Sequence, residues 1–292
     1  MEPLVAFSGV RWNRQFSTDD QERALAALED GQVLFFPRLA FGLNAGEEQF
    51  LSPSILEKSK NVSYNPATGE VGNTACQGDD RVAIANMIGR YAKMTKQLFA
   101  NLLPAYHPGL TQARTSLRPV EIAGRNSSWR KDDTRLHVDS FPSAPTQGRR
   151  ILRVFCNVNP QGKPRTWRIG ESFSAVAKRF WPALRPPLPG SSFWLNLIRF
   201  TKTRRTGYDH FMLRLHDRMK SDEQYQKSPV GTVFDFPAGS TWAAFTDQVS
   251  HAALSGIHQL EQTFTLPVAR MHHPERSPLY ILESLAGRRL AA

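Results

Sequence analysis

Hydrophobic and polar residues alternate with helical spacing near the start of the chain. Residues 17–30 place apolar side chains on one face, acidic residues in the first turn, and Gly31 directly after the last turn. Ser17 or Thr18 can cap the first turn. The apolar run 32–36, which stops at a proline, predicts a strand.

Two further segments show helical spacing. Residues 80–103 carry large apolar side chains near one face and end before Pro104, which predicts a second helix. Residues 277–287 begin with Ser277 as a cap and Pro278 at the first helical position, and they present an apolar face. We expect a closing helix there.

The pattern changes beyond about residue 111. Short apolar runs follow one another, separated by Pro, Gly, Ser or Asn, and each predicts a strand. These runs are Arg114–Glu121, Leu136–Ser140, Ile151–Asn159, Ser192–Phe200, Thr232–Phe236, Thr241–Phe245 and Gln262–Val268. Many short strands with regular punctuation favour a mainly β fold with flanking α-helices, built on a double-stranded β-helix (a cupin-like jelly roll).

The chain has 292 residues, which suits one or two domains. Helical patterns come first and strand patterns later, so we predict one domain over residues 1–292. A mostly helical N-terminal part (1–110) packs on the jelly-roll core (111–270), and the closing helix lies in 271–292.

Composition narrows the class of protein. Hydrophobic residues make up 40 %, which is typical of globular proteins. Two cysteines are too few for a disulfide framework or a cysteine zinc site. The sequence shows no export signal and no apolar run long enough to span a membrane, so a cytoplasmic location is expected. The net charge of +11 leaves nucleic acid, an anionic membrane and an acidic small molecule as partners.

The candidate chemistry begins in the run Leu136–Ser140. In a strand, His137 and Asp139 project from the same face, since they are two residues apart. An imidazole and a carboxylate on one face can bind one metal ion. A second histidine would complete the facial triad that is typical of non-haem Fe(II) oxygenases. Taken alone, the pair is more typical of a surface loop with a His–Asp hydrogen bond, because this triplet often occurs by chance.

His251 is the best candidate for the third ligand. It lies among small residues after two predicted strands and a Pro-Ala-Gly turn, and another strand follows it. This order resembles the double-stranded β-helix of the Fe(II)/2-oxoglutarate dioxygenases, which implies Fe(II), 2-oxoglutarate and O2. The remaining histidines suit the role less well: His107, His210, His216, His258, His272 and His273.

The co-substrate 2-oxoglutarate has a distal carboxylate that needs a cation. No Lys or Arg lies in 261–265, where related enzymes often carry one. Arg153 is the only charge within an apolar strand, and by alternation it shares a face with Asn157. We therefore predict Arg153, Asn157 and Gln262 as co-substrate-binding residues. The alternatives are that Arg153 pairs with an acid such as Glu261 or points to solvent.

A narrower resemblance rests on three segments. Residues 134–160, the following Pro-Arg-Thr-Trp-Arg at 164–168 and the tail at 277–283 are similar to those of the Kdo hydroxylases. These bacterial dioxygenases act on 3-deoxy-D-manno-oct-2-ulosonic acid (Kdo) attached to lipid A. The resemblance implies hydroxylation at C3 of this sugar and places the iron triad on His137, Asp139 and His251.

The positive charge is concentrated around this motif. Residues 111–170 contain twelve Lys and Arg against four Asp and Glu, so a fifth of the chain carries eight of the eleven net charges. Kdo carries a carboxylate and lipid A carries phosphates, so basic residues at the site would bind and steer such a substrate. The candidates are Arg130, Arg135, Arg149, Arg150 and Arg168, and any one of them is as readily a solvated surface charge.

A second basic cluster at Lys202, Arg204 and Arg205 suggests peripheral contact with an anionic membrane surface. We expect no nucleic-acid partner, because no aromatic-rich nucleic-acid motif is present. Two alternatives remain open. One is a dioxygenase acting on a different anionic substrate, and the other is a basic jelly-roll protein that binds without catalysis.

Overall fold

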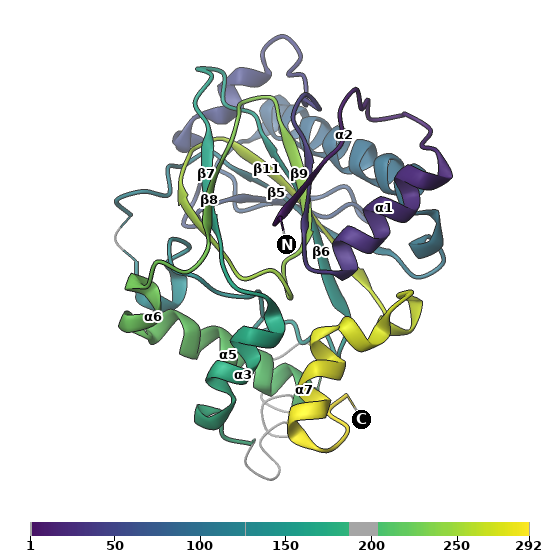
Figure 1. The fold of residues 1–292 in the computed structure, drawn as a ribbon. Helices are drawn as coiled ribbons and strands as arrows, with labels where there is room; N and C mark the ends of the chain where they lie inside the picture. Colours follow the sequence, from purple (N-terminus) through teal and green to yellow (C-terminus); the bar gives the residue numbers. More distant parts are fainter. Residues whose placement is uncertain (1, 126, 187–203, 292) are drawn as a thin grey trace.

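The computed structural model describes residues 2–125, 127–186 and 204–291. Its strands form two sheets, one large and one small (Figure 1). The large sheet has the order β1-β2-β9-β6-β11-β5-β3-β4, and the small sheet has the order β10-β7-β8. The strands are β1 (Leu4–Ala6), β2 (Val33–Phe36), β3 (Val62–Tyr64), β4 (Val71–Gly72), β5 (Thr111–Arg118), β6 (Arg150–Asn157), β7 (Arg165–Ile169), β8 (Thr232–Phe236), β9 (Thr241–Phe245), β10 (His251–Ser255) and β11 (Gln259–Leu266).

Helices cover the sheets from two sides. Helices α1 and α2 lie against the large sheet, and α3, α5, α6 and α7 gather at the lower end of the molecule (Figure 1). Their bounds are α1 (Thr18–Glu29), α2 (Gly78–Leu102), α3 (Phe173–Phe180), α5 (Gly207–Ser221), α6 (Glu223–Lys227) and α7 (Pro278–Ala286). Among these helices, α1, α2 and α7 match the three predicted from the sequence.

The helix ends show why these segments are helical. The hydroxyl of Ser17, rather than that of Thr18, accepts a hydrogen bond from the N–H of Asp20 at 3.2 Å and caps α1. Gly31 follows the helix with φ +76°, a left-handed conformation that favours glycine. Ser277 caps α7 in the same way as Ser17 caps α1.

Aromatic side chains fill the space between the two sheets. Trp167 of the small sheet packs edge-on against Trp242 of the large sheet, with ring centroids 5.6 Å apart. Trp242 also stacks on Phe236 at 4.2 Å and on Phe155 at 5.5 Å. Two facing antiparallel sheets with a shared apolar layer form a jelly-roll type core. The predicted fold class is therefore confirmed.

The predicted strands agree with the structure to different degrees. Strands β8 and β9 have the predicted bounds, whereas β5, β6 and β11 begin one to three residues earlier than expected and end two or three residues earlier. Residues 136–140 form no strand and make only an isolated bridge between His137 and His251. The predicted strand 192–200 lies outside the described residues.

The N-terminal part was predicted to be mostly helical, and this was incomplete. It supplies β1 and β2 to one edge of the large sheet and β3 and β4 to the other edge. Three of these four strands have only two or three residues, too few for an alternating pattern to stand out in the sequence. Within the described residues, no helix is long and apolar enough to cross a membrane.

Candidate metal centre and the pocket around it

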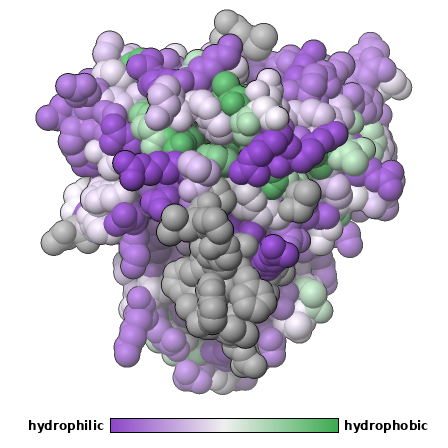
Figure 2. Space-filling model, turned by 90° about the horizontal axis from the view of Figure 1, so that it is seen from below, coloured by the Kyte–Doolittle hydropathy of each residue, from purple (hydrophilic) through white to green (hydrophobic). Residues whose placement is uncertain are grey.

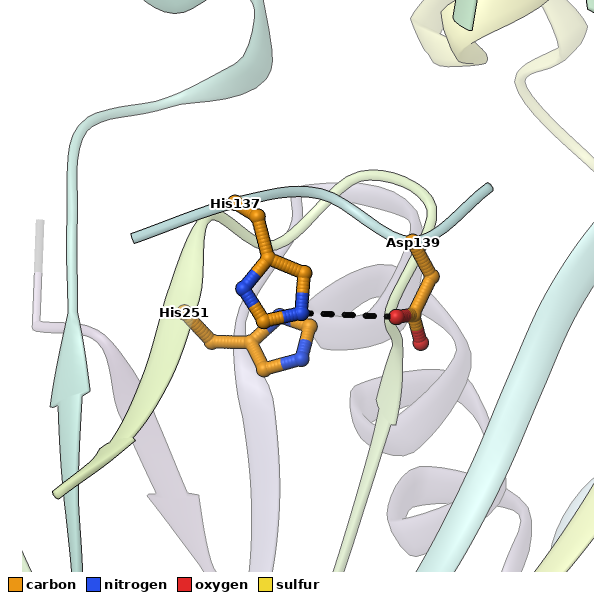
Figure 3. Close-up of side chains that lie close together, drawn as sticks. All are labelled: His137, Asp139 and His251. Carbon is orange, nitrogen blue, oxygen red and sulfur yellow. Dashed lines mark ion pairs between the residues drawn. The ribbon is translucent and has the colours of Figure 1, made fainter. Parts of the chain in front are cut away.

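Two histidines that are far apart in the sequence form one backbone pair. The N–H of His137 donates to the carbonyl of His251 at 3.0 Å, and the N–H of His251 donates back at 2.8 Å. Residues opposite one another in an antiparallel pair project their side chains from the same face. The two imidazoles therefore lie together, with ring centroids 4.7 Å apart (Figure 3).

The hydrogen bonds of both rings select the same tautomer. Nδ1 of His137 lies 2.7 Å from the carbonyl of Arg135, and Nδ1 of His251 lies 2.8 Å from the carbonyl of Val249. Each Nδ1 must therefore carry the proton and donate it, which leaves the Nε2 lone pair free as a metal ligand. Burial lowers the pKa of His137 to about 3 and also lowers the pKa of His251, so both rings are neutral at physiological pH.

Asp139 completes the group. Its N–H donates to the carbonyl of Thr246 at 2.8 Å, and its Oδ1 lies 3.7 Å from Nε2 of His137. Burial by itself would raise the pKa of Asp139, but the charge of Arg153 and the contact with His137 hold it well below its usual value. One ligand atom from each of the three residues lies within 4.8 Å of the others. Two neutral imidazoles and one ionised carboxylate fit a divalent iron ion.

A pocket of about 50 Å³ lies beside these three side chains. Its wall includes three arginines, Arg118 from β5, Arg153 from β6 and Arg165 from β7, together with Glu261 from β11. The charge concentration that the sequence shows around His137 therefore reaches the site itself.

Arg153 is paired on both sides. Its Nη1 lies 3.1 Å from Oδ2 of Asp139 and 3.4 Å from Oε1 of Glu261. The pair with Glu261 was one of the two alternatives that the sequence left open. Arg153 is thus close to the metal ligands, but its charge is already met by two carboxylates.

The ion pairs continue away from the metal ligands. Arg118 contacts the second oxygen of Glu261 at 3.1 Å and Asp133 at 3.5 Å, and Asp133 in turn contacts Lys60 at 2.6 Å. This chain alternates acid and base from Asp139 to Lys60. Its cations and anions therefore largely neutralise one another.

Arg165 differs from the other two arginines. Its side chain is buried, its Nη1 donates to the carbonyl of Gly256 at 3.0 Å, and its Nε has no hydrogen-bond partner. Burial and the nearby Arg118 lower its pKa to about 9. Among the described residues, no carboxylate makes a salt bridge with it. The sequence prediction missed Arg165, although alternation in 165–169 places it on the same face as the apolar Trp167.

Two of the predicted co-substrate residues lie elsewhere. The side chain of Gln262 bonds to Thr115 at 2.7 Å and to Gln112 at 3.1 Å, on the face of β11 opposite to the pocket. Asn157 donates to the carbonyls of Lys163 and Phe236 and closes a turn. Alternation along β11 explains the position of Gln262. Its neighbour Glu261 faces the pocket, so the side chain of Gln262 projects from the opposite face.

Three predicted substrate arginines have structural partners. Arg150 is fully buried and pairs with Asp247 at 2.7 Å, and Arg149 bonds to Thr265 at 3.1 Å. Arg168 donates to three backbone carbonyls in 226–230. None of the three lines the pocket.

Arg130 and Arg135 form ion pairs with acids of helices α5 and α6. Arg130 is exposed and contacts Asp217 at 3.3 Å, and Arg135 contacts Glu223 at 2.6 Å. Neither lines the pocket. Helix α5 also brings His216 to an edge-on contact with His137, with ring centroids 5.4 Å apart, which the sequence did not suggest.

A family described as 3-deoxy-D-manno-oct-2-ulosonic acid (Kdo) hydroxylase matches residues 11–289. Comparison with the curated proteins found no match.

Three solved structures of the Kdo hydroxylase KdoO, a non-haem Fe(II) alpha-ketoglutarate-dependent dioxygenase, are similar over nearly the whole chain. The complex with alpha-ketoglutarate (2-oxoglutarate) and Fe(III) is 48% identical with a TM-score of 0.96, covering 99% of this chain and 97% of that one. The cobalt(II) complex is 48% identical with a TM-score of 0.98, covering 100% and 98%. The apo structure is 49% identical with a TM-score of 0.97, covering 99% and 98%.

One of these structures contains iron and alpha-ketoglutarate, the metal and the co-substrate that the sequence led us to expect. Both the family match and the structural similarity extend over the N-terminal part, the jelly-roll core and the closing helix. The chain therefore belongs to the Kdo hydroxylases, a family of Fe(II)/2-oxoglutarate-dependent dioxygenases.

Proposed function

We propose that this protein hydroxylates Kdo at C3 in the lipopolysaccharide inner core. The substrate is Kdo-lipid A, the product carries a D-glycero-D-talo-octulosonic acid unit, and succinate and CO2 are co-products. The observation that carries this proposal is the group of His137, Asp139 and His251 in a family of Kdo hydroxylases. Their ligand atoms lie close together beside Arg165, which makes no salt bridge with an acid among the described residues.

The three ligand residues perform the first task, which is to hold the metal. Iron, 2-oxoglutarate and O2 together supply an oxidant for an unactivated C–H bond, which no side chain can provide. The protein keeps both imidazoles neutral and in one tautomer, and it keeps the carboxylate ionised. A site prepared in this way binds a divalent cation without first losing protons at neutral pH.

Arg165 is proposed as the anchor of the distal carboxylate of 2-oxoglutarate. A buried guanidinium without an anion is unfavourable, and a carboxylate ligand would remove that cost through charge-assisted hydrogen bonds. Arg165 lines the same pocket as His251 and is carried by β7, which pairs directly with β10. This assignment replaces Arg153, whose charge is already met by Asp139 and Glu261.

Arg153 is proposed to orient the iron-binding carboxylate. Its contact is to Oδ2 of Asp139, whereas Oδ1 is the oxygen that faces His137 (Figure 3). One oxygen is thereby held by the arginine and the other is left for the metal. Such outer contacts to ligating carboxylates tune both the geometry and the affinity of metal sites.

The function is tested with purified protein, Kdo-lipid A, Fe(II), ascorbate and 2-oxoglutarate. We expect the lipid to gain the mass of one oxygen atom, and His137→Ala and His251→Ala to abolish this gain. His273→Ala, at an exposed histidine away from the pocket, is the matched control and should retain activity. Wild-type protein that consumes 2-oxoglutarate without modifying the lipid would favour another anionic substrate. A wild-type protein that binds neither metal nor 2-oxoglutarate would favour binding without catalysis.

Because Kdo-lipid A is a membrane lipid, we also propose peripheral contact with an anionic membrane surface on the cytoplasmic side. On the face that includes the lower end of the molecule, many hydrophilic side chains and some hydrophobic ones are exposed (Figure 2). Arg185 and Arg204 are exposed there, and Arg205 donates to the carbonyl of Pro142. Lys202, the third member of the cluster seen in the sequence, lies outside the described residues.

A further inference from the structure

The segment that carries His137 and Asp139 has an unusual support. It is extended, but it belongs to neither sheet. On one side its backbone pairs with His251, through the two hydrogen bonds between His137 and His251. Inside a sheet, a strand in this position would also form backbone hydrogen bonds with a second strand on its other side.

The side chain of Gln226 takes the place of this second strand. The amide of Gln226, in the short helix α6, accepts a hydrogen bond from the N–H of Leu136 at 2.7 Å and donates to the carbonyl of Leu136 at 3.0 Å. It donates a further hydrogen bond to the carbonyl of Met219, at the end of α5, at 2.8 Å. The Gln226 amide thus pairs with Leu136 as a strand residue would, one position before the first metal ligand.

Gln226 is itself held in place by Arg168. The guanidinium of Arg168 donates to the carbonyls of Val230 at 2.7 Å and of Gln226 at 3.0 Å, and it also contacts the carbonyl of Ser228. Arg168 lies on β7, where it is the register partner of Ala252, the residue after His251. The small sheet therefore supports both histidines, His251 directly and His137 through Arg168 and Gln226.

We propose that Gln226 is a positioning residue for the metal centre and that Arg168 supports it. This inference rests on the proposed function of His137 and Asp139 as iron ligands. The reason for glutamine is chemical. At this place the side chain must accept from one backbone group and donate to another, and an amide is the group of suitable length that does both. Residues that orient metal ligands in this way change metal affinity by about 10- to 100-fold when they are replaced.

The test compares Co(II) binding by the wild type, Gln226→Met and Gln226→Glu. Methionine keeps the length of the side chain and removes all three hydrogen bonds of the amide, whereas glutamate keeps the acceptor and removes the donor. The matched control is Gln224→Met, at an exposed position of the same helix. The readouts are Co(II) affinity by calorimetry, the visible absorption bands of bound Co(II), and the melting temperature of each metal-free protein.

We expect both Gln226 variants to bind Co(II) at least about tenfold more weakly, with altered absorption bands, and Gln224→Met to match the wild type. Arg168→Met should weaken Co(II) binding as well, and the double variant with Gln226→Met should lose less than the two separate effects combined, since both act on one contact. If Gln226→Met does not fold, Gln226→Glu carries the test.

A failure of this inference can be distinguished from a failure of the proposed metal centre. If His137→Ala loses Co(II) but both Gln226 variants bind it as tightly as the wild type with the same absorption bands, Gln226 does not position the site and the inference fails. If His137→Ala itself binds Co(II) like the wild type, the proposed metal centre is wrong, and the inference falls with it.

Discussion

Three arginines line the pocket, two from the large sheet and one from the small sheet, and they differ in what surrounds them. Arg118 and Arg153 each contact two carboxylates, whereas Arg165 has a single backbone carbonyl as its partner. An incoming carboxylate gains most from the cation that is not already neutralised, because it displaces no existing ion pair. We therefore base the proposed role of each arginine on its partners and not on its distance from the metal ligands.

The roles of Arg165 and Arg153 can be separated by two variants. Arg165→Met should raise the KM for 2-oxoglutarate roughly 10- to 100-fold, since a charged hydrogen bond contributes about 1.5–3 kcal/mol, and it should leave Co(II) affinity unchanged. Arg153→Met should weaken Co(II) binding about tenfold and affect the KM for 2-oxoglutarate less once metal is saturating. Steady-state kinetics and calorimetry provide the two measurements. The reverse pattern would return the anchor to Arg153.

Arg150 provides a test of stability at the same scale. Its guanidinium is fully buried between Asp247 and the ring of Phe245, so Arg150→Met leaves the carboxylate of Asp247 buried without a cation. We expect a loss of about 3–5 kcal/mol in the free energy of unfolding, measured by urea denaturation. Arg149→Met, at the half-buried neighbouring position, should cost much less. Folded Arg150→Met protein with an impaired KM for Kdo-lipid A and normal stability would instead support a substrate role.

At the scale of elements, the pocket depends on how closely the end of β10 approaches β7. Gly256 follows β10 with φ +119°, and a Cβ atom built there would lie 2.9 Å from Cα of Arg165. Its N–H also donates to Glu121 at 2.6 Å. The glycine therefore allows the turn to pass directly over the arginine that we propose as the anchor.

Gly256→Ala should displace Arg165 and raise the KM for 2-oxoglutarate severalfold, while the metal ligands at the other end of β10 keep their Co(II) affinity. Gly162→Ala is the matched control, because Gly162 also has a positive φ of +74° but has no atom within 4 Å of its added Cβ. Both variants place a residue with a Cβ at a positive φ, which costs of order 1 kcal/mol or more. Equal effects of the two on the KM would show that strain alone is responsible.

At the scale of the whole molecule, the basic residues of this chain, whose net charge is +11, occur in different settings. Around the metal ligands, Arg153 and Arg118 are paired with acids. At the lower end, Arg185 and Arg204 are exposed. Exposed basic residues near an anionic bilayer contribute about 1 kcal/mol each, and salt weakens this attraction.

We expect the protein to sediment with vesicles that contain phosphatidylglycerol, to remain in solution with pure phosphatidylcholine vesicles, and to be released as ionic strength rises. The double variant Arg185→Glu and Arg204→Glu should bind the anionic vesicles more weakly. Lys93→Glu together with Lys96→Glu, on exposed positions of α2, makes the same change in charge elsewhere. Equal losses in both double variants would argue against a membrane contact at the lower end.

Local chemistry was sufficient to predict much of the fold. The cap at Ser17, the stop at Gly31 and the alternation in β8 and β9 all act between residues that are close in the chain, so their effects can be read from the sequence. The short strands at the N-terminus are different, because they exist only through pairing with distant partners. The division of the chain into an N-terminal part, a core and a closing helix within one domain stays a prediction.

The sequence by itself determined the type of fold and the family, and it singled out the candidate metal ligands. It did so because a His-x-Asp pair, a later histidine and strand alternation are patterns of residue type and spacing. The tertiary structure alone decided what each charged side chain faces. Arg153 meets Asp139 and Glu261, Arg150 meets Asp247, and Arg165 meets no acid among the described residues. The role of a charged residue depends on partners that folding brings together from distant parts of the chain. A local sequence pattern cannot predict these partners.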